Sequence, residues 1–489
     1  LAVVIRATAG LCEVVKRHAT GTPTLVVGCD ARYGSSEFAT AACRVASAAG
    51  VRVLALPQAN PTPLTSFSML HFDADAGVMV TASHNPAPDN GYKVYLGGTV
   101  VQGDGRGVQI VPPFDAEIAA AIEAAPPADE VPMSDDLIEA VDPREEYVAC
   151  ASALASGEAS AREDLRIVLT AMHGVGAAIT SRVLTEAGFS NVSLVEAQAQ
   201  PDPDFPTVPF PNPEEAGALD MAIEQAREQG ADLIIAVDPD ADRCALAVPD
   251  PTSETGWSPL SGDQIGSLLG EFLAERGMTG SLANSIVSSR LLSRIARAHG
   301  LEHHTTLTGF KWIARAPGLG FGYEEAIGFC PDPAHVRDKD GIATSVVAAS
   351  LVAALKAQGR SVWDELERLA RLHGLHVSSP LTFRVEEIEQ IASGMARLRA
   401  QPPSVLAGSP VVEVSDLSQG YRGLPPTDGV LVLTEAGDRV IARPSGTEPK
   451  LKCYLEVILP VAEGESLPWE QARERLDSIK GAFAEIIGL

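Results

Sequence analysis

The sequence lacks the cysteine patterns of a disulfide framework or a zinc site. Its seven cysteines are odd in number, far apart and never arranged as Cys-x-x-Cys. Such usage is typical of reduced thiols, so we expect a cytoplasmic location. No apolar run approaches the roughly 20 residues that a membrane helix needs, and the short apolar start at residues 1–5 has no charged leader. Neither a membrane span nor a signal peptide is therefore predicted.

Positive charge is also scarce. The chain has 37 Lys and Arg against 64 Asp and Glu, which gives a formal net charge of -27. Binding to a nucleic-acid backbone needs clustered Lys and Arg, so this balance argues against a nucleic-acid partner. Binding of small phosphorylated ligands is still possible, because it needs only a few cationic side chains in one cleft. Oligomeric state cannot be inferred from the sequence.

The arrangement of apolar runs predicts an α/β protein of four domains. With 489 residues the chain is long enough for three or four domains. Residues 24–50, 165–188 and 281–300 each show a β-branched apolar run, a turn and a stretch of helical period, which indicates alternating strands and helices. The segment after 383 instead has a helical stretch followed by short strand-like runs. We predict three related α/β domains with mixed sheets (1–145, 146–258 and 259–378) and a C-terminal α+β domain (379–489), with boundaries good to several residues.

Three aspartates alternate with other residues directly after an apolar run, in "LIIAVDPDADRCAL". Residues 233–237 predict a buried strand, and Asp238, Asp240 and Asp242 follow it. Ligands of open α/β sheets bind at the carboxyl ends of strands. Like charges about 4 Å apart repel by roughly 4 kcal/mol per pair at an effective dielectric near 20, so three crowded carboxylates need a cation. Mg²⁺, which typically joins carboxylates to substrate phosphate, suits this site, and the adjacent Arg243 favours an anion there too.

This stretch has two other interpretations. An EF-hand would need Gly at its sixth position and Glu at its twelfth, whereas the chain has Arg243 and Pro249 there, which excludes it. A solvated acidic turn without a metal stays open on this stretch alone.

The stretch "VIARPSGTEPKLK" has the residue types of a phosphate cradle. Arg443 can clamp a phosphate with two hydrogen bonds, while Ser445, Gly446 and Thr447 can turn backbone N–H groups and two hydroxyls toward an anion. An ordinary turn between strands, in which Ser and Thr bond their own backbone, is the competing interpretation.

An acidic pair between glycines suits the recognition of a sugar. In "GLGFGYEEAIGF", Glu324 and Glu325 can accept hydrogen bonds from vicinal hydroxyls, while the glycines permit close approach. A helix N-terminus with acidic residues in its first turn explains the same pattern about as well.

A serine is presented at the end of an apolar run in "GVMVTASHNPAPDNGYKVY". Pro86 forces the chain to turn after Ser83, and His84 and Lys93 lie nearby in sequence as proton carriers. The stretch does not match the Gly-x-Ser-x-Gly elbow of hydrolases. A turn serine that bonds only its backbone is the alternative for Ser83 taken alone.

The four stretches fall one per predicted domain, and together they resemble the α-D-phosphohexomutases, the phosphoglucomutase and phosphomannomutase superfamily. "TASHNP" is similar to its phosphoserine loop, "DPDADR" to its metal loop, "GYEEAIG" to its sugar loop and "RPSGTEP" to its phosphate loop. "TGFKWI", which contains Lys311, and "DKDG" at 338–341 extend the resemblance over nearly the whole chain.

The resemblance implies an isomerase that interconverts hexose 1-phosphate and hexose 6-phosphate, with mannose and/or glucose as the sugar. Ser83 would be carried as phosphoserine, bridged by Mg²⁺ to the three aspartates, and a bound hexose 1,6-bisphosphate would serve as intermediate and activator. Arg243 would offset charge on the transferred group, and His84 and Lys93 are candidates for general acid and base. The other implied roles are phosphate binding by Arg443, Ser445, Gly446 and Thr447, and hydroxyl binding by Lys311, Glu324 and Glu325.

Two departures from the family pattern stand out. Ala326 occupies the place of a serine in many sugar loops, so the sugar preference is not fixed by this loop. "RATAGLCEV" does not match the family's N-terminal Gly-Thr-x-Gly-x-Arg-Gly stretch, and the chain does not begin with Met, so we expect an incomplete N-terminus.

The open alternatives within the family are a phosphopentomutase and a sugar bisphosphate synthase. A phosphatase that passes the phosphate to water is a third, and a non-catalytic sugar-phosphate-binding protein is the alternative from another class.

Overall fold

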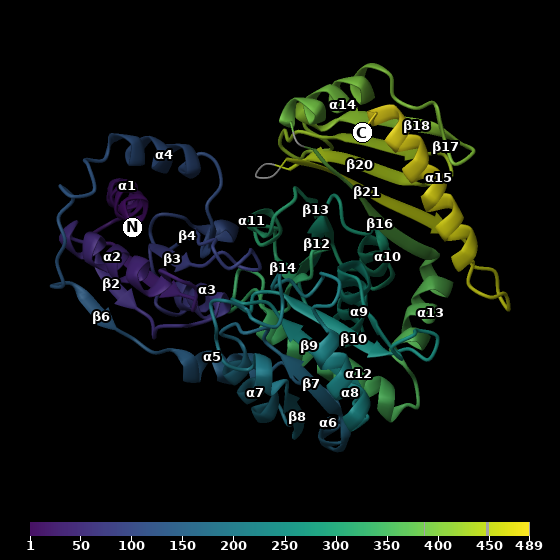
Figure 1. The fold of residues 1–489 in the computed structure, drawn as a ribbon, viewed down its shortest axis with the longest axis horizontal. Helices are drawn as coiled ribbons and strands as arrows, with labels where there is room; N and C mark the ends of the chain where they lie inside the picture. The colour runs from purple at the N-terminus through teal and green to yellow at the C-terminus, as the bar shows by residue number, and fades with distance from the viewer. Residues whose placement is uncertain (386, 446–448, 489) are drawn as a thin grey trace. The chain divides into compact units, whose positions relative to one another are not determined.

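The structure is a computed structural model that describes residues 1–385, 387–445 and 449–488. By its internal contacts the chain divides into two compact units. The first comprises Leu1–Ala283 and Gly309–Val362, and the second comprises Asn284–Thr308 and Trp363–Leu489. Figure 1 traces the elements in chain order.

The first unit begins with a six-stranded mixed sheet in the order β5-β4-β3-β1-β2-β6. Successive side chains of its central strand point to opposite faces, as pleating requires. Leu25 and Val27 pack against α1 and α2, while Val26 packs against Met69 of α3. The strands are β1 (Thr24–Cys29), β2 (Arg52–Ala55), β3 (Ala76–Val80), β4 (Tyr92–Leu96), β5 (Val108–Gln109) and β6 (Ile138–Ala140). The helices are α1 (Ala2–His18), α2 (Ser35–Ala48), α3 (Thr62–His71) and α4 (Phe114–Ala124), with a 3-10 turn at Gly103–Gly105.

A second mixed sheet of the first unit has the order β11-β10-β9-β7-β8. Its strands are β7 (Arg166–Thr170), β8 (Asn191–Leu194), β9 (Leu233–Val237), β10 (Cys244–Pro249) and β11 (Trp257–Pro259). β7 is parallel to β8 and β9, whereas β10 folds back antiparallel to β9. The apolar run of β9 is fully buried, as a central strand with both faces covered requires. The helices are α5 (Arg144–Ser152), α6 (Ala159–Asp164), α7 (Ala177–Glu186) and α8 (Asp220–Gln229), with a 3-10 turn η2 (Glu196–Gln198).

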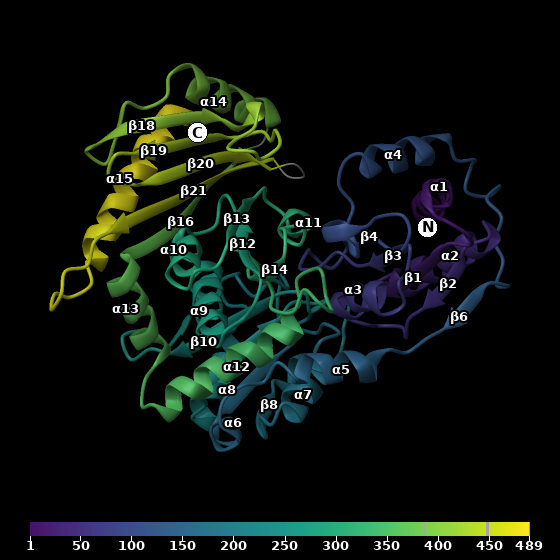
Figure 2. The ribbon, with the colours of Figure 1, turned by 180° about the vertical axis from the view of Figure 1, so that it is seen from behind.

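The rest of the first unit contributes a hairpin and two buried helices. Strands β14 (Leu319–Glu324) and β15 (Gly328–Cys330) pair antiparallel. Helix α9 (Gly262–Glu275) begins with a capping box in which Ser261 and Gln264 each bond the other's backbone N–H. Helix α12 (Gly341–Ala357) contacts β9 and β10 and is seen well in Figure 2. The short helix α11 (Phe310–Ile313) precedes β14. Strand β12 (Ser281–Ser285) comes at the boundary between the units, and α10 (Leu291–Ala298) and β13 (His303–Thr306) belong to the second unit.

The second unit is built on a six-stranded sheet in the order β16-β21-β20-β19-β18-β17. Its strand pairings are antiparallel. Both faces of β20 are covered: Val440 and Ala442 pack against α14 and α15 on one face, and Ile441 packs against Ile286 and Val287 on the other. The strands are β16 (Leu375–Arg384), β17 (Val405–Leu406), β18 (Ser409–Asp416), β19 (Val430–Thr434), β20 (Arg439–Pro444) and β21 (Lys450–Leu459). The helices are α13 (Val362–His373), α14 (Ile388–Ala400) and α15 (Trp469–Ile487), with a 3-10 turn at Leu417–Gln419.

Within the described part of the chain, no single helix combines the length and the hydropathy needed to cross a membrane. The pair α12 and α13, bent by 92° at its break, reaches both only in combination.

Candidate active site

The three aspartates form a compact buried cluster at the turn between β9 and β10. Asp238, Asp240 and Asp242 each offer a carboxylate oxygen, and these oxygens lie within 4.8 Å of one another. All three residues are 0% exposed. Ala241 between them has a positive φ of 56°, which bends the turn tightly enough to bring alternate side chains together. The sequence prediction that these residues converge agrees with this geometry.

Two lysines partly neutralise the aspartates. Lys93 Nζ lies 2.7 Å from Asp240 Oδ2 and 2.7 Å from Asp242 Oδ2, and Lys339 Nζ lies 3.2 Å from Asp242 Oδ2. Burial disfavours the charged form of Lys93, but the two aspartates outweigh it and raise the pKa of that ammonium. Burial likewise opposes the charge on Asp240, yet Lys93 outweighs burial and lowers the pKa of this carboxyl.

Part of the cluster accepts no hydrogen bond from the described residues, although Arg243 Nε lies 3.9 Å from Asp242 Oδ1. The Oδ1 atoms of Asp240 and Asp242 are buried and accept no hydrogen bond from the described residues. Burial and the neighbouring aspartates raise the pKa of Asp238 well above its usual range, so the protein by itself does not stabilise three negative charges. Unpartnered buried carboxylate oxygens are costly, and oxygen atoms are the ligands that hard divalent cations bind. The residues present therefore fit a divalent metal ion.

Ser83 reaches this cluster from the loop after β3 of the first sheet. Its Oγ donates a hydrogen bond of 2.9 Å to Asp238 Oδ2, although the two residues are 155 positions apart. Ser83 follows the end of β3 and has a positive φ of 50°, an uncommon conformation for a residue with a side chain. Its backbone N–H donates to Thr81 Oγ1 at 2.9 Å, which fixes the turn.

His84 lies beside Ser83 and is neutral. Its Nδ1 is 3.3 Å from Ser83 Oγ. Burial and, next, the positive charge of Arg243 lower the pKa of His84 to about 2. Arg243 donates its backbone N–H to Asp238 Oδ1 at 3.0 Å, and its own pKa is raised because Asp242 and Glu324 outweigh the effect of burial.

Three residues that the sequence analysis did not assign also hold the site. Arg32 is 4% exposed. Its guanidinium donates hydrogen bonds to the carbonyl oxygens of Ser83 at 2.6 Å, Asn85 at 2.6 Å and Pro86 at 2.8 Å. Arg32 therefore fixes the shape of the serine loop. Lys339 is the second cation described above. The spacing in sequence gave no signal for Arg32, whereas Lys339 stands within the quoted "DKDG".

Thr62 is the third of these residues. At the start of α3, its Oγ1 donates to Asp240 Oδ2 at 2.6 Å and its backbone N–H donates to Asp240 O at 2.9 Å. The side chain is fully buried. Thr62 therefore holds Asp240 at two points across 178 positions of sequence.

The acidic pair predicted for sugar recognition ends β14, next to the metal loop. An isolated antiparallel bridge joins Arg243 to Gly328, and the Cys244 N–H donates to Ile327 O at 3.1 Å, so the β14–β15 turn and the aspartate turn are neighbours. Glu324 is 8% exposed, and Glu325 is half-buried.

Lys311 lies on α11 in the same unit. Its carbonyl oxygen accepts a hydrogen bond from Arg315 at 2.7 Å. No hydrogen bond or ion pair between described residues joins its side chain to the aspartates.

The predicted phosphate-binding residues belong to the second unit. Arg443 lies in β20, and the Ser445 N–H donates to Lys450 O at 2.9 Å as the chain turns into β21. Gly446 and Thr447 lie outside the described residues.

Comparison with known proteins gives one consistent family. Residues 1–128, 145–252 and 261–372 match the phosphoglucomutase/phosphomannomutase alpha/beta/alpha domains I, II and III, and residues 383–470 match the C-terminal domain of the same family. A Haemophilus influenzae protein named "Probable phosphomannomutase" is 44% identical over 461 residues, covering 93% of this chain and 92% of its own. A Staphylococcus haemolyticus phosphoglucomutase is 34% identical, covering 89% and 83%.

A solved structure shares the fold. A phosphoglucomutase/phosphomannomutase family protein from Burkholderia thailandensis matches with a TM-score of 0.72 at 20% identity. The match covers 99% of this chain and 94% of that protein. The predicted fold class, three α/β domains with mixed sheets and a C-terminal α+β domain, is confirmed, and so is the resemblance on which the enzyme class was based. The chain belongs to the phosphoglucomutase/phosphomannomutase family, and it is accordingly an isomerase of the phosphohexose mutase type.

Proposed function

We propose that this protein interconverts hexose 1-phosphate and hexose 6-phosphate, with mannose and/or glucose as the sugar, through a phosphoserine at Ser83. The observation that carries this proposal is the hydrogen bond of 2.9 Å between Ser83 Oγ and Asp238 Oδ2, beside buried carboxylate oxygens that accept no hydrogen bond from the described residues. The relatives named phosphomannomutase and phosphoglucomutase support the same class of substrate.

The reaction is a pair of phosphoryl transfers at one centre. The free hydroxyl of the sugar monophosphate, on C6 or C1, loses its proton and attacks the phosphorus carried by Ser83. The bond between phosphorus and Ser83 Oγ breaks, and a hexose 1,6-bisphosphate forms. The bisphosphate reorients, Ser83 Oγ attacks its other phosphate, and the isomeric monophosphate leaves. The same bisphosphate, supplied from outside, would phosphorylate an empty Ser83, which makes it the activator.

The charged residues around Ser83 fit this chemistry. Mg²⁺ held by Asp238, Asp240 and Asp242 would neutralise negative charge on the transferred group. Lys93 stays protonated between Asp240 and Asp242, so its charge offsets theirs instead of accepting a proton. Arg243 adds a second fixed positive charge beside the cluster.

Proton transfer is assigned to His84. This neutral ring lies 3.3 Å from Ser83 Oγ, close enough to take up the proton of the attacking hydroxyl through one of its ring nitrogens. A phosphoryl group on Ser83 would bring negative charge next to the ring and so raise its pKa from about 2 toward a value at which it accepts a proton.

The remaining predicted roles are retained as part of this proposal. Sugar hydroxyls are bound by Glu324, Glu325 and Lys311, and the phosphate that does not react is bound by Arg443, Ser445, Gly446 and Thr447. We also propose a cytoplasmic location and a division into four domains at 1–145, 146–258, 259–378 and 379–489.

The test is an assay of the purified protein with Mg²⁺ and a trace of glucose 1,6-bisphosphate. Glucose 1-phosphate, mannose 1-phosphate and ribose 1-phosphate are offered in parallel while free phosphate is monitored. We expect isomerisation of a hexose phosphate without stoichiometric phosphate release. Preference for ribose 1-phosphate would indicate a phosphopentomutase, and phosphate release would indicate a phosphatase. Unchanged turnover in Ser83→Ala would contradict the phosphoserine scheme, and Ser36→Ala, which removes another hydroxyl of the same sheet domain, is the matched control.

A further inference from the structure

Strand β8 forms an open edge of the second sheet. It is the last strand in the order β11-β10-β9-β7-β8, and among the residues that the structure describes it pairs only with β7. The Val195 N–H donates to Leu169 O, and in a parallel pair the residues that bond the neighbour alternate along the strand. The backbone N–H and C=O groups of Val192 and Leu194 are therefore directed away from β7, to the side where another strand would add.

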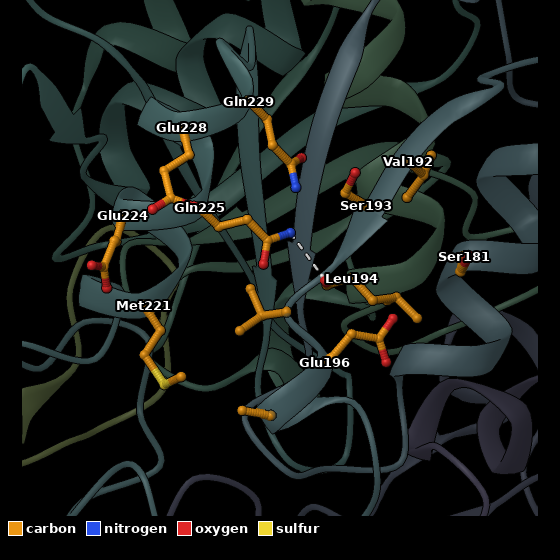
Figure 3. Close-up of a pocket in the computed structure, with 12 residues that line it drawn as sticks. Ser181, Val192, Ser193, Leu194, Glu196, Met221, Glu224, Gln225, Glu228 and Gln229 are labelled. Carbon is orange, nitrogen blue, oxygen red and sulfur yellow. Dashed lines mark hydrogen bonds between the residues drawn. The ribbon is translucent and has the colours of Figure 1, made fainter.

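A groove runs along this edge. Its volume is about 630 Å³, and it is lined by the six consecutive residues 192–197. Figure 3 shows side chains of α8 along one side of the groove and Ser181 of α7 on the other. Val192, Ser193 and Leu194 are only half-buried, so the strand is accessible from the groove.

One outward group of β8 is already paired with a side chain. Gln225 of α8 donates from Nε2 to Leu194 O at 3.0 Å, and this bond is drawn in Figure 3. An amide N–H of a side chain thus stands where a backbone N–H of an added strand would stand. No hydrogen bond between described residues reaches the outward N–H of Val192, the C=O of Val192 or the N–H of Leu194.

The charge of the groove selects the kind of strand that fits. Glu196, Glu224 and Glu228 line it and are exposed, and no Lys, Arg or His is among the residues that line it. None of these glutamates forms an ion pair with another described residue. A second copy of this chain, with its net charge of -27, would be repelled from such an edge.

We propose that the open edge of β8 binds an extended, Lys- or Arg-rich segment of another protein by strand addition. The main chain of the segment would pair with Val192 and Leu194, and its cationic side chains would face the three glutamates. Edge addition derives affinity from main-chain hydrogen bonds and specificity from alternate side chains. This inference is independent of the proposed function, since it uses no residue of the aspartate cluster or the serine loop.

A fluorescently labelled peptide, acetyl-Lys-Val-Lys-Val-Lys-Val-Lys-amide, tests the proposal by fluorescence anisotropy with the full chain. We expect saturable binding that weakens as salt is raised. The double variant Glu224→Gln/Glu228→Gln should bind about tenfold more weakly, because it removes two exposed ion pairs. Arg227→Gln on the same helix is the charge-change control. Mutase turnover of each variant should stay at the wild-type level and so reports correct folding.

Two further probes separate strand addition from simple attraction between charges. Val192→Pro removes only an N–H that faces the groove and should weaken binding several-fold. The same peptide with alternate backbone N-methyl groups should bind several-fold more weakly to the unchanged protein, which gives an answer even if the proline variant folds poorly. Equal binding of the methylated and unmethylated peptides, or no binding of either, would overturn the proposal.

Discussion

Two buried charge clusters, one in each compact unit, differ in how fully their charges are paired. The first unit holds Asp238, Asp240 and Asp242, which are 0% exposed and crowded within 4.8 Å. Lys93 and Lys339 neutralise them in part, yet two carboxylate oxygens have no hydrogen-bond partner among the described residues.

The cluster of the second unit is centred on one carboxylate, Glu456, which is 0% exposed and has both oxygens paired. Its Oε1 accepts from Ser289 Oγ at 2.7 Å, the Arg290 N–H at 2.8 Å and His376 Nδ1 at 3.0 Å. Its Oε2 accepts from Arg290 Nε at 2.6 Å, and Arg439 Nη2 lies 3.4 Å away. Burial opposes this charge, but Arg439 and the other partners outweigh burial and lower the pKa of Glu456 well below its usual range.

This difference in hydrogen bonding distinguishes a buried charge that stabilises the fold from one that serves function. A buried charge that serves the fold has every oxygen satisfied, because any unpaired one would cost stability with no return. A cluster with carboxylate oxygens that accept no hydrogen bond, and with a carboxyl whose pKa is raised, lowers the stability of the folded state. It persists because the rest of the fold stabilises the protein. Such a cluster is organised for a partner that the chain itself does not supply.

The largest effect is expected from breaking the incomplete cluster. Asp238→Asn should lower mutase turnover by about a thousandfold or more, since it removes the group that contacts Ser83 and supplies one carboxylate. The folded state should not lose stability, because the pKa of Asp238 is raised and its charge is therefore unfavourable in the fold. Turnover and thermal unfolding, measured on the same sample, check this. A large loss of stability would mean that the cluster serves the fold.

Breaking the complete cluster should have the reverse outcome. Glu456→Gln should lower the free energy of unfolding by about 3–5 kcal/mol, because Arg290 and Arg439 lose their buried counter-charge. Denaturant unfolding measures this loss. Binding of Mn²⁺ by the aspartates, measured by electron paramagnetic resonance, should be unchanged. Glu413→Gln, on β18 of the same sheet with an exposed Arg422 as partner, is the matched control and should cost little.

Loosening the incomplete cluster should give an intermediate effect. Thr62→Val removes the hydroxyl that fixes Asp240 and should weaken Mn²⁺ binding by about 10- to 100-fold, as is typical for a residue that orients a metal ligand. Thr65→Val on the same helix is the control, because its hydroxyl contacts Asn60 and Met79 instead of a carboxylate. Equal affinities of both variants for Mn²⁺ would show that Thr62 does not position the cluster.

The smallest effect concerns the dependence of stability on pH. The pKa of Glu456 is depressed in the folded protein, so its contribution is complete above the unfolded value of about 4.3 and is lost as pH falls toward the folded value. The second unit should therefore lose stability below about pH 4, and Glu456→Gln should flatten this dependence. Unfolding curves at a series of acidic pH values check the sign. A variant with the same slope as the wild type would contradict it.

Much of the fold and part of the site could be predicted from sequence because the relevant signals are local. The apolar run of β9 followed by Asp238, Asp240 and Asp242 lies within ten residues, so the cluster can be recognised without knowing the fold. Alternating strand and helix patterns likewise need only short windows. Ser83 was identified from its turn, and the structure brings it to Asp238.

The remaining residues could not be predicted because their contacts join distant parts of the chain. Thr62 and Asp240 are 178 positions apart, and Arg32 reaches a loop more than 50 positions later. Lys93 is predicted as a proton carrier from its place in sequence, but its distances of 2.7 Å to two aspartates could not be predicted from that place. Pairings of this kind are set by how the sheets pack, which no short pattern encodes.

The most direct test of the central claim is mass spectrometry of the protein after incubation with glucose 1,6-bisphosphate and Mg²⁺. The account predicts one phosphoryl group on the peptide that contains Ser83, and its transfer to added mannose 1-phosphate or glucose 1-phosphate as a bisphosphate. Turnover at the normal rate with no phosphate on Ser83 would contradict the account.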